Sequence, residues 1–188
     1  MAEYTKATDK QGKKLNLGCG SNIKPGWINL DCKDLPGVDV VHNIEDLPLP
    51  FGDNQFDVVR CDNVLEHIEY INLLKDIHRI LKPEGLLIVR VPHFTTRLNY
   101  SDPTHKKLFS IDTFNFFVAG LTDKDYYFDF HFSRLALRKI RFYKKGIFWL
   151  NRLIEPVINC SPKMQRFYES SFLAGLFPAN HIYAELIK

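Results

Sequence analysis

The sequence predicts a doubly wound α/β domain, in which short strands of a mostly parallel sheet alternate with helices. Short runs rich in Val, Ile and Leu recur along the chain, as strands of a covered parallel sheet do. The first run ends in the Gly-x-Gly turn of "LNLGCGSN", residues 15–22. A long pattern of helical period separates two later runs, which favours crossover connections between parallel strands.

Seven strands are expected from these runs. The first two are separated by so few residues, Pro25 and Gly26 among them, that the link has room for at most one helical turn. The predicted strands are 13–17, 27–30, 38–41, 56–60, 86–91, 135–142 and 181–187.

One helix is predicted between the fourth and fifth strands. Apolar residues recur there at spacings of three and four from Val64 to Leu81, and Pro83-Glu84-Gly85 ends the pattern. A shorter helix is expected at 111–119. The segment 144–180 should carry helices of its own, because structureless loops of that length are rare in compact domains.

Composition predicts one globular domain over residues 13–188, preceded by a polar tail, 1–12. The chain has 188 residues, 45% of them apolar, and no stretch long and apolar enough for a membrane-spanning helix. With no secretory signal visible, we expect a soluble, cytoplasmic protein. Its four cysteines form no Cys-x-x-Cys pair, so the sequence predicts neither a disulfide framework nor a metal site. A net charge of +3 gives no clear nucleic-acid signature.

The glycine turn and the acid after the second strand indicate a ligand site. Gly18 and Gly20 let the backbone approach a ligand, and Asp31 ends the second strand, where a carboxylate can accept both hydroxyls of a ribose. A dinucleotide fingerprint would place a glycine at Ile23 and an acid near Asp39, which precedes the third strand instead of following it. An NAD-dependent oxidoreductase is therefore the weaker alternative.

Five motifs, in order and spacing, resemble those of the class I S-adenosylmethionine-dependent methyltransferases: "LNLGCGSN", Asp31, "HNIEDLPLPFGDNQFDVV", "DNVLEHI" and "RILKPEGLLIVRVP". The resemblance covers roughly residues 13–92. It implies a Rossmann-like, seven-stranded sheet, mostly parallel with an antiparallel last strand, and S-adenosylmethionine as the cofactor. The cofactor-binding residues that it implies are Asn16, Leu17, Gly18, Cys19, Gly20, Asp31, Asn43, Ile44, Cys61 and Asp62.

Two positions depart from the family pattern. Asn16 and Asn43 stand where the family often has acids, and an amide brings no negative charge toward the sulfonium or ammonium group of the cofactor. We expect binding to survive but to be weaker. A protein that keeps the fold and binds the cofactor without turnover is the alternative that these two residues leave open.

Polar residues beyond the fifth strand are candidates for catalysis. His93 follows that strand directly, and Asp102 and His105 belong to "SDPTHKKLFS", a segment similar to ones found in a subset of the family. A methyl transfer to a hydroxyl needs a base, which a histidine can supply. The alternatives are a buried structural histidine for His93 and a capped turn for the other two. Glu66 and His67 are assigned to the cofactor-side wall.

The acceptor side should reside in the insertions at about 93–133 and 144–180. Six basic residues and no acid lie between positions 134 and 145. This pattern favours the solvated face of an edge strand over a site for an anionic acceptor. The apolar segment 147–158 is favoured as a lid or core helix over a membrane contact. The acceptor itself is expected to be a small molecule or a glycan or lipid precursor.

Overall fold

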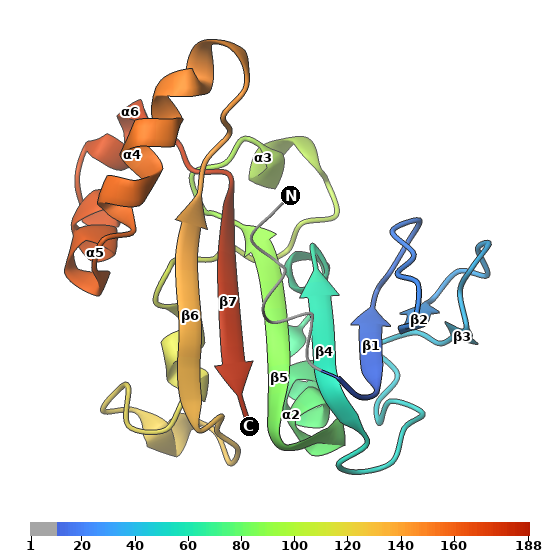
Figure 1. The fold of residues 1–188 in the computed structure, drawn as a ribbon. Helices are drawn as coiled ribbons and strands as arrows, with labels where there is room; N and C mark the ends of the chain where they lie inside the picture. The colour runs from blue at the N-terminus through green and yellow to red at the C-terminus, as the bar shows by residue number, and fades with distance from the viewer. Residues whose placement is uncertain (1–10) are drawn as a thin grey trace.

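The computed structural model describes residues 11–188, so most of the predicted polar tail lies outside the described residues. A single seven-stranded sheet forms the centre of the fold, with strand order β3-β2-β1-β4-β5-β7-β6 (Figure 1). The strands are β1 (Lys14–Leu17), β2 (Ile28–Asp31), β3 (Val40–Val41), β4 (Phe56–Asp62), β5 (Leu81–Pro92), β6 (Arg134–Arg141) and β7 (His181–Ile187).

The strand directions match the prediction. Strands β1 to β5 run parallel, and β7 pairs antiparallel with both β5 and β6. All seven predicted strands are present, and the main difference is that β5 begins at Leu81 instead of residue 86. Because β1 lies between β2 and β4, the chain order reverses next to the glycine turn, which is where such sheets bind ligands.

The helix between β4 and β5 is shorter than predicted. A 3-10 turn, η1 (Leu65–His67), comes first, and helix α2 (Tyr70–Ile80) begins only after the extended backbone of Ile68. Ile71, which the spacing of three and four includes in the apolar pattern, is 40% exposed. Ile71 belongs to the first turn of α2, and Leu73, Leu74 and Ile77 lie on the buried face of this helix.

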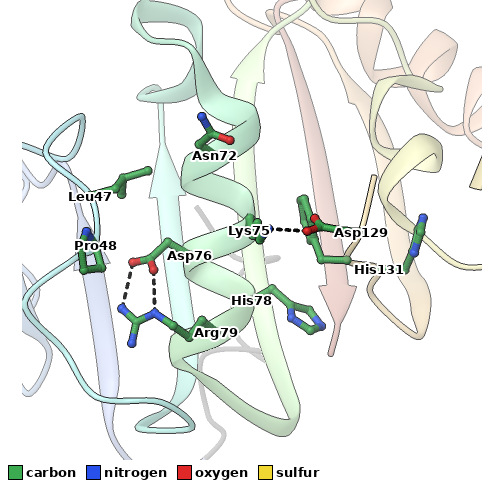
Figure 2. Close-up of a pocket in the computed structure, with 10 residues that line it drawn as sticks. Leu47, Pro48, Asn72, Lys75, Asp76, His78, Arg79, Asp129 and His131 are labelled. Atoms are coloured by element: carbon green, nitrogen blue, oxygen red, sulfur yellow. Dashed lines mark hydrogen bonds and ion pairs between the residues drawn. The ribbon is translucent and has the colours of Figure 1, made fainter. Parts of the chain in front are cut away.

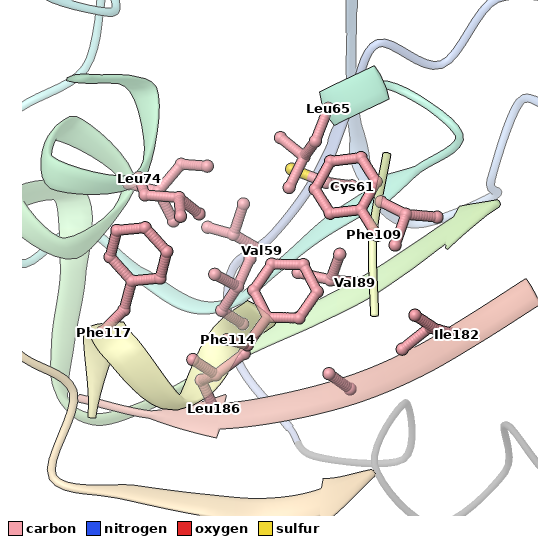
Figure 3. Close-up of a cluster of buried hydrophobic side chains, with 14 of the residues drawn as sticks. Val59, Cys61, Leu65, Leu74, Val89, Phe109, Phe114, Phe117, Ile182 and Leu186 are labelled. Carbon is pink, nitrogen blue, oxygen red and sulfur yellow. The ribbon is translucent and has the colours of Figure 1, made fainter. Parts of the chain in front are cut away.

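One face of the sheet packs against α2 and the aromatic side chains of the segment after β5. Val59 and Cys61 of β4, Val89 of β5 and Leu186 of β7 meet Phe109 and Phe114 there (Figure 3). This core fixes the strand ends at which the candidate site is built. The segment holds α3 (Leu98–Ser101), η2 (Thr113–Phe117) and η3 (Asp125–Tyr127), so the helix predicted at 111–119 is a 3-10 helix.

The segment between β6 and β7 is helical, as predicted, with η4 (Gly146–Leu150), α4 (Asn151–Ile158), α5 (Pro162–Ser170) and α6 (Leu173–Leu176) beside the carboxyl end of β6 (Figure 1). Helix α4 is only partly the core helix that was favoured. It buries Asn151, Glu155 and Ile158, whereas Leu153 and Val157 are 65% and 58% exposed. Within residues 11–188 no helix is long and apolar enough to cross a membrane.

Candidate cofactor and acceptor site

The turn after β1 leaves open space for a ligand. Gly18 and Gly20 adopt positive φ values of 64° and 49°, a region that favours glycine. A Cβ on Gly18 would lie 2.6 Å from the Val64 side chain, whereas a Cβ on Gly20 would meet nothing within 4 Å. Gly18 is therefore required by packing, and Gly20 borders a space that a side chain would fill. This cradle fits a bound cofactor.

Asn16, two residues before Gly18, is held by hydrogen bonds within the protein. Its buried side chain donates from Nδ2 to Asn22 O at 2.9 Å and to Asn29 Oδ1 at 3.0 Å. Asn29 in turn donates to the carboxylate of Asp39, which also accepts the Asn29 backbone N–H at 2.7 Å. Asn16 therefore anchors the loop through a chain of amides that spans β1 and β2, and its contact with a cofactor stays a prediction.

Asp31 stands at the lip of the cradle. Its carboxylate accepts the Gly20 backbone N–H at 2.7 Å through Oδ2 and the Lys33 backbone N–H at 3.0 Å through Oδ1. Each oxygen keeps a second lone pair, so the half-buried carboxylate can still accept two hydroxyl donors. This geometry suits a ribose diol next to the glycine turn.

The link from β1 to β2 argues against a dinucleotide. Among residues 18–27 there are only turns, and the fingerprint's pyrophosphate requires the N-terminus of a helix at this point. Ile23, which replaces the third glycine, packs against Gly37 in the next link, whose built Cβ would lie 3.0 Å from the Ile23 side chain. The NAD alternative therefore lacks its phosphate-binding element.

Other predicted cofactor residues divide into lining and core positions. Asn43 is exposed, and its side chain accepts the Glu45 N–H at 3.2 Å, while half-buried Ile44 packs against the core next to it. The side chains of Leu17 and Cys61 are fully buried in the core, and burial raises the pKa of the Cys61 thiol. With side chains this deeply buried, Leu17 and Cys61 can contribute to the predicted site only through main-chain atoms. Cys19 is also almost fully buried.

Asp62 ends β4 with its carboxylate held between two arginines. It forms ion pairs with Arg60 and Arg90, and all three side chains lie on the sheet face opposite Cys61. The next residue, Asn63, has a positive φ of 55° and donates its N–H to Arg90 O at 2.8 Å. This bend directs the chain from the strand end into η1, beside Gly18. Sequence reasoning missed Asn63, although an Asn after a strand is a common left-handed residue.

A polar cluster lies one turn further on, where η1 meets the segment after β5. The backbone N–H groups of Lys106 and Lys107 donate to Glu66 O, at 2.7 and 3.2 Å, and so bring His105 against η1. The rings of His67 and His105 meet edge to face, with centroids 4.8 Å apart. Two residues of the predicted acceptor segment, Asp102 and His105, thus join Glu66 and His67 in one place.

Burial shapes the charges of this cluster. Glu66 is 1% exposed, and desolvation raises its pKa to about 7. Burial and the neighbouring His105 lower the pKa of His67, which favours the neutral imidazole. Asp102 accepts the N–H and the hydroxyl of Thr104, and these hydrogen bonds lower the pKa of its carboxyl. The predicted capped turn is therefore real, and it also supports His105.

His93 occupies a different environment. Its side chain has no exposed surface, and its ring nitrogens contact Thr95 Oγ1 at 2.8 Å and Glu169 Oε1 at 3.0 Å. The same Glu169 oxygen accepts the Ile111 N–H at 2.7 Å. His93 therefore ties β5 to α5 inside the fold, and the catalytic hypothesis for it gives way to the structural alternative.

Part of the basic run at 134–145 is paired with acids from other segments. Arg138 pairs with Asp112 at 2.6 Å, and Arg141 and Lys144 both reach Glu155, at 2.8 and 2.7 Å. β6 is the edge strand that was favoured, but these three side chains are engaged instead of freely solvated. The run consequently offers no support for an anionic acceptor.

A separate groove of about 640 Å³ runs along the outer side of α2 (Figure 2). Lys75 and Asp129 form an ion pair at 2.5 Å across it, and Asp76 and Arg79 pair at 2.6 Å on the other side. The groove lies against the helix and not at the carboxyl ends of the strands, so it is not the cofactor site.

Comparison with known proteins supports the predicted class. The sequence model of a family described as "Methyltransferase domain" matches residues 19–89. An uncharacterized protein of Methanocaldococcus jannaschii is 42% identical over 83 residues, which are 44% of this chain and 33% of that protein. A demethylmenaquinone methyltransferase of Geobacillus stearothermophilus is 32% identical over 84 residues, 44% of this chain and 36% of the relative. The matched region thus spans about a third of the length of these relatives.

Solved structures show the same architecture over nearly the whole chain. A SAM-dependent methyltransferase from Archaeoglobus fulgidus superimposes with a TM-score of 0.62 at 19% identity, covering 98% of this chain and 90% of that one. The YcgJ protein of Bacillus subtilis gives 0.57 at 15% identity, covering 95% and 92%. The sheet and its glycine turn therefore define a Rossmann-like methyltransferase fold. Residues 19–89, which carry most of the predicted motifs, match the methyltransferase-domain model, and the fold agrees with the class that the sequence predicted.

Proposed function

We propose that this chain binds S-adenosylmethionine at the glycine turn and transfers its methyl group to a small-molecule acceptor. The observation that carries the proposal is the open cradle at Gly20, bordered by the Asp31 carboxylate, at the point where the strand order reverses. The cofactor supplies a sulfonium methyl group. The protein has to hold the donor and acceptor in line, and it forms no covalent intermediate.

Each part of the site has a task in this reaction. Asp31 accepts the ribose hydroxyls, exposed Asn43 and half-buried Ile44 flank the adenine, and main-chain groups of residues 17–20 approach the methionine part. The Asn16 network holds the turn in place. His105, Asp102, Glu66 and His67 stand on the acceptor side, where a proton must leave if the acceptor is a hydroxyl.

Support for a small-molecule acceptor comes from the relatives, several of which are named demethylmenaquinone methyltransferases. The ion pairs of Arg138 and Arg141 reduce the positive charge available on β6, which favours an uncharged acceptor over an anionic one. Glycan and lipid precursors are the other acceptor classes to assay. A cofactor-binding protein without turnover is the second candidate, which the missing acids at Asn16 and Asn43 favour.

Two measurements test the proposal. Incubation with methyl-labelled S-adenosylmethionine and fractionated cell extract should place label in a small-molecule fraction, and Gly20→Val should abolish the labelling while circular dichroism shows an intact fold. Binding of the donor without label in any fraction would support the second candidate. Label in protein or RNA would contradict the proposed acceptor class.

A further inference from the structure

We infer that Glu66, His67 and His105 form a binding site for a divalent transition-metal ion on the acceptor side of the fold. One ligand atom from each of the three residues lies within 4.8 Å of the other two. Two ligands about 2.1 Å from a tetrahedral zinc ion lie about 3.4 Å apart, so small side-chain movements would close the site. The sequence predicted no metal site because these ligands come from two distant segments.

Glu66 supplies the first argument. Both of its carboxylate oxygens are buried, and neither finds a hydrogen-bond donor in the described part of the chain. A buried carboxylate without a partner is costly, and a bound cation is one of the few groups that removes this cost. The arginines on the other side of β4 are already engaged by Asp62, so they do not serve Glu66.

The histidines supply the second argument. Nδ1 of His67 contacts Thr104 Oγ1 at 2.8 Å, which leaves Nε2 for a metal. Nε2 of His105 faces Asp102 Oδ2 at 3.7 Å, while Nδ1 is buried and has no hydrogen-bond partner in residues 11–188. Each imidazole therefore has one nitrogen directed to a supporting group and one available, the arrangement that metal-binding histidines usually show.

The "SDPTH" turn explains how both imidazoles are held. Asp102 Oδ1 accepts the Thr104 N–H at 2.9 Å and its hydroxyl at 2.6 Å, so one turn supports the partner groups of both rings. The backbone bonds from Lys106 and Lys107 to Glu66 O fix this turn against η1. The turn therefore does more than satisfy its own backbone groups, because it also holds the two imidazoles that would bind the metal.

Two imidazoles and one carboxylate suit zinc and other first-row divalent ions, and such sites leave coordination positions open. Val64, which packs on Gly18, is two residues from Glu66, so the metal would lie close to the cofactor turn. If the proposed function holds, an acceptor hydroxyl bound to the metal would lose its proton more readily. That consequence rests on the proposed function, whereas metal binding itself does not.

Calorimetric titration of the chelator-treated full chain with Zn²⁺ alone, without S-adenosylmethionine, tests the site. We expect one equivalent to bind, and Glu66→Gln and His105→Gln each to weaken binding at least tenfold. Thr104→Val should weaken it less, because Thr104 only supports a ligand. His131→Gln, which changes a histidine in the groove along α2, is the matched control and should bind as the parent does.

Absorption of the Co²⁺-loaded protein gives a readout that is independent of activity, because the visible bands report coordination by nitrogen and oxygen. Glu66→Gln keeps the size of the side chain. If it fails to fold by circular dichroism, His67→Gln, at a half-buried position, replaces it. The inference is overturned if Zn²⁺ does not bind saturably or binds the ligand variants as tightly as the parent. Metal binding without methyl transfer would instead overturn only the proposed function.

Discussion

Gly18→Ala tests the packing of the glycine turn most sharply. At a φ of 64° the left-handed backbone conformation destabilises an alanine by about 1–2 kcal/mol. Its Cβ would also lie 2.6 Å from Val64 Cγ2, a distance that real Cβ contacts do not show. Overpacking of this kind costs about 1–3 kcal/mol. The variant should therefore lose about 2–5 kcal/mol of unfolding free energy.

Gly20→Ala is the matched control. Its φ of 49° carries the same backbone penalty, but its Cβ meets nothing within 4 Å, so it should lose only about 1–2 kcal/mol. Urea unfolding followed by circular dichroism measures both. The order should be reversed for ligand binding. The alanine methyl group at position 20 enters the cradle, so Gly20→Ala should affect S-adenosylmethionine binding more than stability.

A double mutant separates the two parts of the Gly18 effect. Val64→Ala should cost about 1.6 kcal/mol alone, from about 0.8 kcal/mol for each lost carbon. Combined with Gly18→Ala it should cost less than the sum of the single changes, because the clash is removed. Equal losses for Gly18→Ala and Gly20→Ala, or strict additivity with Val64→Ala, would refute this packing.

Three further predictions concern charge. Asp31→Ala should weaken S-adenosylmethionine binding by about 1–3 kcal/mol in calorimetry, because ribose hydroxyls lose their acceptor; unchanged affinity would remove Asp31 from the ribose site. Burial lowers the pKa of His181 to about 4 from 6.5, so the unfolded chain takes up a proton first and stability should fall between pH 6.5 and 4, by less than about 3 kcal/mol. His181→Asn should flatten that part of the profile, and an identical profile would contradict the assignment. Glu155→Ala should cost about 2–3 kcal/mol in urea unfolding, because Arg141, Lys144 and the Phe142 N–H lose a shared acceptor. Its control, Lys75→Ala, removes an exposed ion pair and should cost under about 1 kcal/mol. Equal losses for the two variants would argue against the buried network.

The strands and the glycine turn were predictable because their signals are local. Runs of Val, Ile and Leu mark the strands, and the glycine turn with Asp31 after the next strand marks the ligand edge. The helix start was not predictable from period alone, since Val64 and Ile68 belong to the preceding turn and happen to continue the repeat. Local patterns do not show such breaks.

The acceptor side could be predicted only in part, because it depends on contacts between distant segments. Asp102 and His105 stay predictions as acceptor-side residues, and their meeting with Glu66 depends on backbone bonds from Lys106 and Lys107. His93 looked catalytic by its position after β5, and only the tertiary contact with Glu169 shows that it is enclosed. Likewise, the acids that pair with the basic run, Asp112 and Glu155, belong to other elements, and the sequence does not show that they meet it.

Titration of the full chain with S-adenosylmethionine and, separately, with NAD tests the central claim most directly. The open cradle at Gly20, with Asp31 at its lip and no helix after β1, predicts that S-adenosylmethionine binds with one-to-one stoichiometry and that NAD does not. Gly20→Val should abolish the binding in a folded protein. Binding of NAD, or binding of S-adenosylmethionine that Gly20→Val leaves unchanged, would contradict the site.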